Sequence, residues 1–233
     1  MFQPVYAQQH GIFPVSSPEI TEQFISFLQK KFRYFNVSLN TFNDIRKEGI
    51  EIQERRNFIL LLKESYSDIS EKYSSHAMRY VKKANSNADI SAQVSSVDFF
   101  RLKDKYGKPS SEEKYISKLK QIIDCSLMEY DGVIYGAYSK QKELIGAAFF
   151  LKENARYTYL SSVLSPEGKQ LRSMYAIVDT FIRDHAGQPF ILDFEGSNIE
   201  GIARFFEGFG ASAEKYQHLK YNNLPWIVKL FKK

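Results

Sequence analysis

Two carboxylates at the end of a short apolar run have the types and spacing that fit catalysis best. Asp193 and Glu195 flank Phe194 at the end of Phe190–Phe194, a run of the length expected for a buried strand. A carboxylate just past a strand terminus can face a cleft and accept a proton from a substrate ammonium group, directly or through water. Glu195 is therefore our candidate general base, while solvation of the following turn explains it equally well. Asp193 either contacts the substrate or is satisfied by a buried donor.

Three further residues complete the candidate catalytic and substrate-binding set. Tyr216 can return a proton to a leaving group, although packing is the commoner role for any one of the chain's 15 tyrosines. Arg79 offers a cation to an anionic substrate, and in the last turn of a predicted helix it also complements the helix dipole. Asn198 is a candidate substrate contact. Its more ordinary role, shared with Ser197, is to cap the next helix.

The stretch from Tyr157 to Tyr221 must position these residues. It predicts a strand at Tyr157–Val163, a turn at Ser165–Gly168, a helix ending at His185, a strand at Phe190–Phe194, a helix at Ile199–Phe209 and a last strand. A strand–helix–strand unit with short loops implies parallel strands joined by a right-handed crossover. Ligands bind beyond the carboxyl ends of such strands, so the residues after Val163 and Phe194 mark the expected site.

The other elements follow from apolar periodicity, caps and turn residues. We expect an extended Phe2–Val15 broken at Pro4, Gly11 and Pro14, a helix from Pro18 to Lys31, and strands at Tyr34–Leu39, Ile50–Ile52 and Phe58–Leu62. One long helix at Tyr66–Asn85, a strand at Ile90–Val94, and helices at Ser96–Tyr106 and Glu112–Asp124 around a loop at Gly107–Ser110 follow. The remaining strands are expected at Met128–Tyr138, Leu144–Leu151, Ala213–Leu219 and Trp226–Phe231. This order predicts an α/β fold, more closely an α+β mixed sheet covered by helices.

Composition and spacing exclude several functions. The net charge of +5 permits an anionic partner such as a nucleotide or tRNA without demanding one. Cys125 is the only cysteine, so a disulfide framework is excluded, and its apolar neighbours suggest a small core residue. No His, Cys and Asp cluster has metal-ligand spacing, and no Walker loop, dinucleotide fingerprint or nucleophile elbow occurs. No apolar run approaches the ~20 residues of a membrane span, and we expect a cytoplasmic protein.

The order of elements from about Asp124 to Lys233 resembles the GNAT (acyl-CoA N-acyltransferase) fold. Three strings also resemble the carboxyl region of the Fem family, which are aminoacyl-tRNA-dependent peptidyl transferases built from two GNAT-like lobes: Leu192-Asp-Phe-Glu-Gly-Ser197, Arg204-Phe-Phe-Glu-Gly-Phe-Gly-Ala211 and Tyr216. Tyr66–Ala84 resembles the helix that opens the second Fem lobe. The resemblance implies a partial N-terminal GNAT-like lobe at residues 1–62 and a C-terminal GNAT-like domain at 63–233.

The resemblance also implies a donor site, with departures. Acetyl-CoA enzymes hold pyrophosphate on the N–H groups of an Arg/Gln-x-x-Gly-x-Gly/Ala loop at a helix N-terminus. The matching segment here, Leu164–Ser173, has one glycine and a proline. The candidate cofactor-binding residues are Gly168, Lys169 and Gln170 for phosphate and Ser161, Ser162 and Val163 for the pantetheine arm. Fem proteins also lack the loop, but most have a lysine near the position of Glu207 that is absent here, and many have a helical tRNA-binding arm.

We therefore predict an N-acyltransferase that moves an acyl group from acetyl-CoA or another acyl-CoA to an amine of a small molecule or peptide, with no metal. The alternatives are a Fem-like transferase that uses charged tRNA and a catalytically silent GNAT-like binding module. The sequence adds no specific support for tRNA, and its aromatic residues follow core spacing rather than a nucleic-acid stacking platform, so we expect no DNA partner. It is compatible with a homodimer. The donor, the acceptor and the oligomeric state are left open.

Overall fold

The computed structural model describes residues 1–13, 17–107, 113–196 and 198–229 and contains two compact units. Unit 1 consists of residues 1–57, 196–198 and 213–233, and unit 2 consists of residues 58–195 and 199–212. The lobes that we propose from the sequence follow the chain with a boundary after residue 62. The units instead interleave, because the C-terminal strand groups with the N-terminal stretch.

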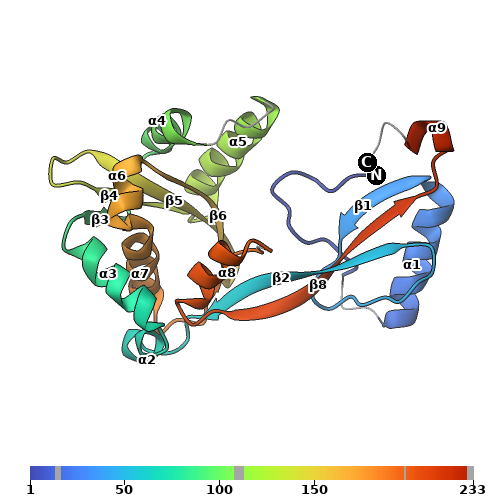
Figure 1. Ribbon diagram of the computed structural model, residues 1–233, viewed down its shortest axis with the longest axis horizontal. Coiled ribbons are helices and arrows are strands. Elements are labelled where there is room, and N and C mark those ends of the chain that lie inside the picture. The colour runs from blue at the N-terminus through green and yellow to red at the C-terminus, as the bar shows by residue number, and fades with distance from the viewer. Residues whose placement is uncertain (14–16, 108–112, 197, 230–233) are drawn as a thin grey trace. The chain divides into compact units, whose positions relative to one another are not determined.

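Unit 1 is a helix packed on a small antiparallel sheet. Its elements are α1 (Pro18–Lys31), β1 (Tyr34–Ser38), most of β2 (Glu51–Leu61) and of β8 (Ser212–Asn222), and α9 (Trp226–Lys229), with the strand order β1-β8-β2 (Figure 1). Ser17 caps α1 and a proline opens it, as predicted. The α1 side chains Ile25 and Leu28 pack with Phe35, Val37 and Leu219, and this cluster is the core of unit 1.

Three expectations for unit 1 were wrong. Of Phe2–Val15, only Phe2 forms a strand-like bridge, to Asn36, because Pro4 and the left-handed Tyr6 (φ 62°) interrupt extended structure; residues 14–16 lie outside the described residues. The two strands expected on either side of Gln53–Asn57 form the single strand β2, since this polar segment has no glycine or proline to end it. Trp226 begins the short helix α9 rather than a strand.

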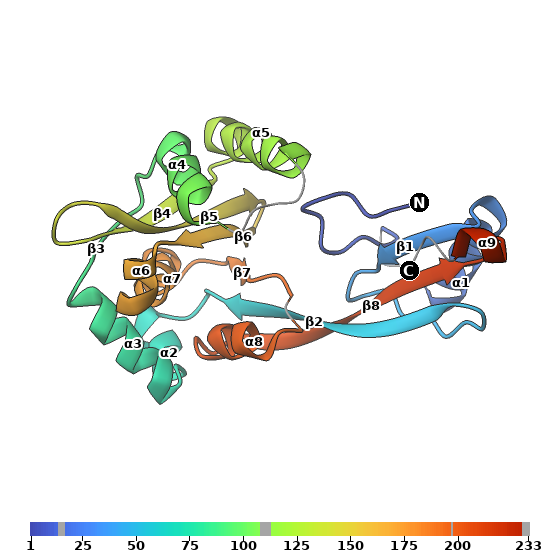
Figure 2. The ribbon, with the colours of Figure 1, turned by 45° about the horizontal axis from the view of Figure 1, so that its top comes forward.

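Unit 2 is a mixed sheet with helices on both faces. Its elements are α2 (Tyr66–Glu71), α3 (Ser75–Asn85), β3 (Asp89–Ser91), α4 (Ser96–Tyr106), α5 (Glu113–Glu129), β4 (Val133–Tyr138), β5 (Leu144–Glu153), β6 (Arg156–Leu164), α6 (Pro166–Leu171), α7 (Ser173–His185), β7 (Ile191–Asp193) and α8 (Glu200–Glu207), with the strand order β2-β7-β6-β5-β4-β3. Helices α4 and α5 cover one face, and α3 and α7 lie on the other (Figure 2).

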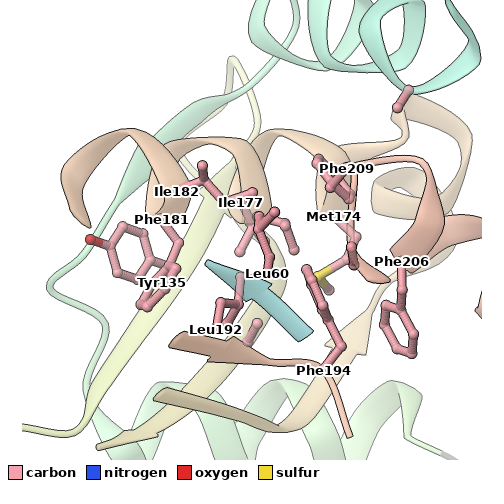
Figure 3. Packing of buried hydrophobic residues seen from close by; sticks show 14 of the residues in the cluster. Leu60, Tyr135, Met174, Ile177, Phe181, Ile182, Leu192, Phe194, Phe206 and Phe209 are labelled. Carbon is pink, nitrogen blue, oxygen red and sulfur yellow. The ribbon is translucent and has the colours of Figure 1, made fainter. Parts of the chain in front are cut away.

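The core of unit 2 lies between the sheet and the α7 face. Ile177, Phe181 and Ile182 project from α7 onto Leu192 and Tyr135 of the sheet, and Phe206 and Phe209 close the end toward α8 (Figure 3). Phe181 stacks on Phe150 of β5 with ring centroids 3.9 Å apart. Helix α7, in which every third or fourth residue is apolar, is thereby packed over the centre of the sheet and buries one face of β6 and β7.

Four expectations for unit 2 are corrected. The long helix Tyr66–Asn85 is two helices, because the Ser74 hydroxyl accepts the Ala77 N–H and starts α3 anew. The turn at Ser165–Gly168 is the first turn of α6, capped by Ser165. Met128 belongs to α5, so the strand that we began there starts at Val133. Cys125 is exposed on α5 rather than buried. Most of the predicted Gly107–Ser110 loop lies outside the described residues.

Within the described residues, no helix combines the length and the apolar character that crossing a bilayer requires. The same part of the chain contains no group of three or more His, Cys, Asp or Glu side chains placed to hold a metal ion.

Candidate active site

The central geometric feature of unit 2 is the point where β6 and β7 separate. The two strands pair in parallel over three residues, ending at Thr158↔Asp193; beyond this point β6 continues to Leu164 paired with β5 but without β7 on its other edge. Leu160 is an extra residue in β6, since its neighbours Tyr159 and Ser161 face the consecutive β5 residues Phe150 and Phe149. Such a bulge bends a strand and increases its twist. The predicted parallel pair is confirmed, and its strands part at their carboxyl ends.

A cavity of about 600 Å³ lies beside the free end of β6. Ser162, Val163 and Leu164 line it from β6, and Ile202, Phe205 and Phe206 line it from α8, with Lys169 and Met174 at the α6–α7 junction. Tyr159 and Phe206 form the apolar floor, with ring centroids 6.2 Å apart. We call this space the β6–α8 cavity. It has the width and apolar lining that suit a flexible acyl-bearing arm.

A second cavity, of about 630 Å³, adjoins the first. It shares Arg172, Tyr175, Gly201 and Phe205 with the β6–α8 cavity and extends along α8 toward α3. We call it the α3–α8 cavity; the rest of its lining is Ser74, His76, Ala77, Tyr80, Arg204, Glu207 and Gly208. The two cavities share these four lining residues, so they are neighbours on unit 2, one beside β6 and one between α3 and α8.

Cations and aromatic rings concentrate in the α3–α8 cavity. The Arg172 guanidinium lies 4.7 Å from the centre of the Tyr80 ring, and Arg79 lies 5.3 Å from the same ring. Tyr80 packs edge-on against Tyr175, and its hydroxyl lies 3.0 Å from Nε2 of His76. Among the described residues Arg172 forms no ion pair with an acid, so it can face an anionic ligand in this cavity, whereas Arg79 is not part of the cavity lining.

Arg172 is held where it is by the backbone. It occupies the left-handed region (φ 62°, ψ 30°) between α6 and α7 and lacks a capping side chain of its own. For a residue with a Cβ this conformation costs about 1 kcal/mol relative to glycine. The break turns the guanidinium toward Tyr80 instead of into the α7 core.

Glu195 has the electrostatics of a general base. Its carboxyl is largely buried beside Asp193, and the burial first and the neighbouring carboxylate second raise its pKa to about 7. Glu195 also has a left-handed backbone (φ 57°), and its N–H donates to Asp193 Oδ1 at 2.8 Å while its carbonyl accepts the Phe58 N–H. Strained backbone and a carboxyl pKa near neutrality are features of catalytic residues. Neither cavity's described lining includes its side chain.

Asp193 is satisfied by a donor rather than left open. It forms an ion pair with Arg156, whose side chain is half-exposed, and it also accepts the Glu195 N–H. Tyr157, which neighbours Arg156, packs on Phe181 of α7, so Arg156 and Asp193 lie on the opposite sheet face, toward α4. Asp193 therefore holds the turn in which Glu195 sits.

Three of the six predicted cofactor-binding residues line a cavity, and the other three do not. Ser162, Val163 and Lys169 line the β6–α8 cavity. The Gly168 N–H donates to the Ser165 hydroxyl and the Lys169 N–H to the Ser165 carbonyl, which leaves neither group for phosphate. Gly168 is needed for packing, because a Cβ there would lie 2.2 Å from the Ile145 carbonyl oxygen. The Gln170 carbonyl accepts Lys83 Nζ.

The remaining predicted residues lie apart from the cavities or at their edge. Ser161 faces α4, where Lys103 Nζ donates to its hydroxyl at 3.0 Å. Arg79 is exposed on α3, with Nη2 3.3 Å from His76 Nδ1. Tyr216 belongs to unit 1 and is buried on β8. Asn198 does not cap α8, since Ile199 occupies the N-cap position without a side-chain bond; Ser197 lies outside the described residues.

Sequence reasoning missed the residues that give the site its charge. Arg172, Tyr175 and His76 were not among the candidates; Tyr175 and His76 lie on helices, and Arg172 lies between two of them, within a stretch whose apolar spacing predicts helix. Lys103 was missed as well; it is partly buried, and this burial lowers its pKa. The signal for Arg172 was its place inside Leu164–Ser173, the segment that matches the phosphate loop.

Comparison with known proteins identifies the fold. The sequence matches no known protein family and no curated protein. Among solved structures, FemX is similar with a TM-score of 0.60 at 10% identity, covering 93% of this chain and 80% of FemX. A conserved protein of unknown function from Bacteroides thetaiotaomicron VPI-5482 has a TM-score of 0.59 at 12% identity, with 87% and 75% covered.

A third similar structure is the C-terminal domain of a putative lysylphosphatidylglycerol synthetase from Agrobacterium fabrum. Its TM-score is 0.50 at 10% identity, with 92% of this chain and 75% of that chain covered. Identities this low show the fold alone. The chain therefore shares the fold of FemX, as its sequence resemblance to the Fem family predicted.

Proposed function

We propose that the protein is an N-acyltransferase that moves an acyl group from an activated donor to an amine. The observation that carries this proposal is the separation of β6 and β7 beyond Thr158 and Asp193, next to the β6–α8 cavity. A donor arm in this cavity can pair with the unpaired edge of β6, whose N–H and C=O groups have no parallel partner there. The reacting carbonyl then lies at the strand tips.

We propose that each cavity binds a chemically different part of the donor. The apolar β6–α8 cavity takes the acyl arm, and the α3–α8 cavity takes an anionic, ring-bearing end group that contacts Arg172, Arg204 and the Tyr80 ring. Coenzyme A and the 3′-terminal nucleotide of tRNA both offer an adenosine with phosphate. The side chains of Arg172 and Lys169 replace the N–H groups of α6, which are already used.

The proposed chemistry assigns Glu195 to proton transfer. Glu195 accepts a proton from the acceptor ammonium group, directly or through water, and the freed lone pair attacks the donor carbonyl carbon. The new C–N bond forms, the C–S bond of a thioester or the C–O bond of an ester breaks, and the leaving thiolate or alkoxide takes up a proton. Tyr216, which the sequence suggested as the acid for this last step, is buried on β8 of unit 1, so we assign it no role in the chemistry of unit 2.

Acyl-CoA is our first candidate donor and aminoacyl-tRNA the second. The second is favoured by one observation: the N–H groups of Gly168 and Lys169 are used inside α6, so the phosphate cradle of acetyl-CoA enzymes is not available here. A transfer assay with radiolabelled acetyl-CoA and, separately, with radiolabelled aminoacyl-tRNA, against a mixture of amines, decides between them. We expect label in product with one donor and at least tenfold less with Glu195→Gln.

Two matched variants make this assay specific. Arg172→Ala removes the cation from both cavities and is expected to raise the KM for the donor, while Lys118→Ala, an exposed lysine on α5, leaves it unchanged. If circular dichroism shows a folded protein and neither donor supports transfer, the result would favour the silent binding module. Transfer that Glu195→Gln leaves intact would remove Glu195 from the mechanism.

A further inference from the structure

The net charge of the protein resides on unit 1. Unit 1 contains 12 lysines and arginines against 7 acidic residues, whereas unit 2 contains 20 of each. The entire excess of +5 therefore belongs to the smaller unit. The proposed acyl transfer makes no use of this asymmetry, because the cavities that carry it lie in unit 2. A charge imbalance of this kind indicates an anionic partner.

Exposed apolar side chains gather at one end of unit 1. Asn223 N–H donates to the Arg33 carbonyl at 2.7 Å, and the Met1 amino group donates to the Tyr34 carbonyl at 2.7 Å. These bonds bring the last turn of α1, the start of the chain and the segment before α9 to the same end of the β1–β8 ladder, where Tyr34 pairs with Asn222. We call this end the α1–α9 surface.

The α1–α9 surface combines large apolar side chains with cations; it consists of Phe2, Phe27, Lys30, Lys31, Trp226 and Ile227. Phe2 is 62% exposed, Phe27 54%, Trp226 73% and Ile227 55%. Lys30 and Lys31 are exposed in the last turn of α1, and Lys31 Nζ lies 5.6 Å from the centre of the Phe27 ring. The core of unit 1 uses a different face of α1, that of Ile25 and Leu28, so the exposed Phe27 is not part of that core.

We propose that the α1–α9 surface binds the surface of an anionic phospholipid bilayer. Trp and Phe side chains enter the boundary between headgroups and acyl chains, and lysines beside them contact anionic headgroups. A nucleic acid is the weaker fit, because Ile227 and the neighbouring Val228 are aliphatic and gain nothing from base stacking. The inference is independent of the proposed acyl transfer.

The chain offers a direct reporter for this contact. Trp226 is its only tryptophan, so the emission spectrum of the full-length protein reports the α1–α9 surface alone. We expect a blue shift of the emission maximum on adding vesicles of phosphatidylcholine with 30% phosphatidylglycerol, a smaller shift with phosphatidylcholine alone, and loss of the shift as salt rises. Co-sedimentation with the same vesicles measures the partition coefficient.

Charge variants test the electrostatic part. Each basic residue near an anionic membrane contributes about 1 kcal/mol, a factor of about five, so Lys30→Gln with Lys31→Gln is expected to lower the partition coefficient roughly 30-fold. The matched control is Lys118→Gln with Lys120→Gln, two exposed lysines on α5 of unit 2, which is expected to change it less than twofold. All four substitutions are on exposed helix positions, so the variants fold.

Three outcomes overturn the proposal. One is no spectral shift and no co-sedimentation with phosphatidylglycerol vesicles. Another is an equal loss of binding in both lysine pairs, which would mean a diffuse charge effect. The third is quenching of Trp226 by tRNA without any response to vesicles, which would assign the α1–α9 surface to nucleic acid.

Discussion

Glu195, which we propose as the general base, lowers the stability of the folded protein at neutral and alkaline pH. Its pKa rises from the ordinary 4.5 to about 7, so the folded protein binds a proton there more tightly than the unfolded chain does. Folding stability at this position is full below pH 4.5, declines as the pH rises to about 7 and is constant above it. The Glu195 carboxylate is buried without a cation beside it, so the protein would be more stable with a neutral side chain at this position. Such a cost to stability is common at catalytic sites.

Glu195→Gln is therefore expected to stabilise the protein at high pH. The gain at pH 8 is roughly 3 kcal/mol at most, from 1.36 kcal/mol for each pKa unit, and it disappears near pH 4. Urea denaturation of both proteins at pH 4 and pH 8 measures it. Equal stabilities at pH 8 would mean that the Glu195 carboxylate is solvated in the folded state.

The activity predicted for Glu195 has the opposite dependence on pH. A general base must be deprotonated, so kcat/KM is expected to rise through pH 7 and level off above it, as Glu195 loses its proton. Stability and activity at this residue thus move in opposite directions between pH 5 and 8. A rate profile without a step near pH 7, measured with the donor that proves active, would contradict the assignment.

A substitution at Arg172 can distinguish the effect of backbone strain from the effect of ligand binding. Arg172→Gly fits the left-handed backbone better and is expected to leave the free energy of unfolding within about 1 kcal/mol of wild type or slightly above it. It removes the guanidinium from both cavities, so donor binding should weaken about tenfold or more. Thermal denaturation and donor titration of the same sample give the two values. A variant that unfolds readily would show that Arg172 has a structural role instead.

At the scale of elements, local signals predicted what local chemistry controls. Helix α4 was predicted with its correct bounds, because Ser95 caps it, Asp98 lies in its first turn and Gly107 follows it. The breaks at Ser74 and Arg172 were missed, since apolar spacing continues across both and neither residue is a glycine or proline. The parallel pairing of β6 and β7 was predicted from the strand–helix–strand unit, whereas the charge of the α3–α8 cavity depends on the relative placement of α3, α8 and the α6–α7 junction, which no local pattern reveals.

A buried carboxylate on α7 joins this helix to α2. Asp179 of α7 has no exposed surface and accepts hydrogen bonds from Tyr66 Oη of α2 and from Arg183. Asp179→Ala is expected to cost about 3 kcal/mol or more, because it leaves a partly buried arginine and a tyrosine hydroxyl without their acceptor. The matched change Arg183→Ala is expected to cost about as much or more, because it leaves the fully buried Asp179 carboxylate without its cation. Denaturation of both variants measures the two costs, and a cost of Arg183→Ala below about 1 kcal/mol would refute this account of the network.

At the scale of the molecule, the interleaved units explain why a boundary drawn along the chain is insufficient. Strand β8 comes last in sequence but pairs with β1, and its Leu219 is fully buried among α1 and β1 residues of unit 1. Pairing between segments so far apart leaves no local signal in the sequence.

A fragment of residues 1–62 should therefore not fold by itself. It lacks β8, so β1 has lost its ladder and the unit 1 core has lost Leu219. Circular dichroism of the fragment is expected to show no cooperative thermal transition, and addition of a peptide spanning residues 211–229 should restore part of the structure. Cooperative unfolding of the fragment alone would contradict this view of unit 1.

The central claim is that an acyl donor lies between the parted strands of unit 2. Gly201 offers the most direct test, because it lines both cavities and a Cβ added there meets no atom within 4 Å. Gly201→Leu places a large side chain at the wall that the two cavities share and is expected to leave the fold intact. Gly201→Ala is its control. Calorimetric titration with acetyl-CoA and with a non-hydrolysable aminoacyl-adenosine analogue is predicted to show binding of at least one of them to wild type and Gly201→Ala, weakened at least tenfold in Gly201→Leu. Equal affinity in all three proteins, or no binding of either ligand at millimolar concentration, would contradict the claim.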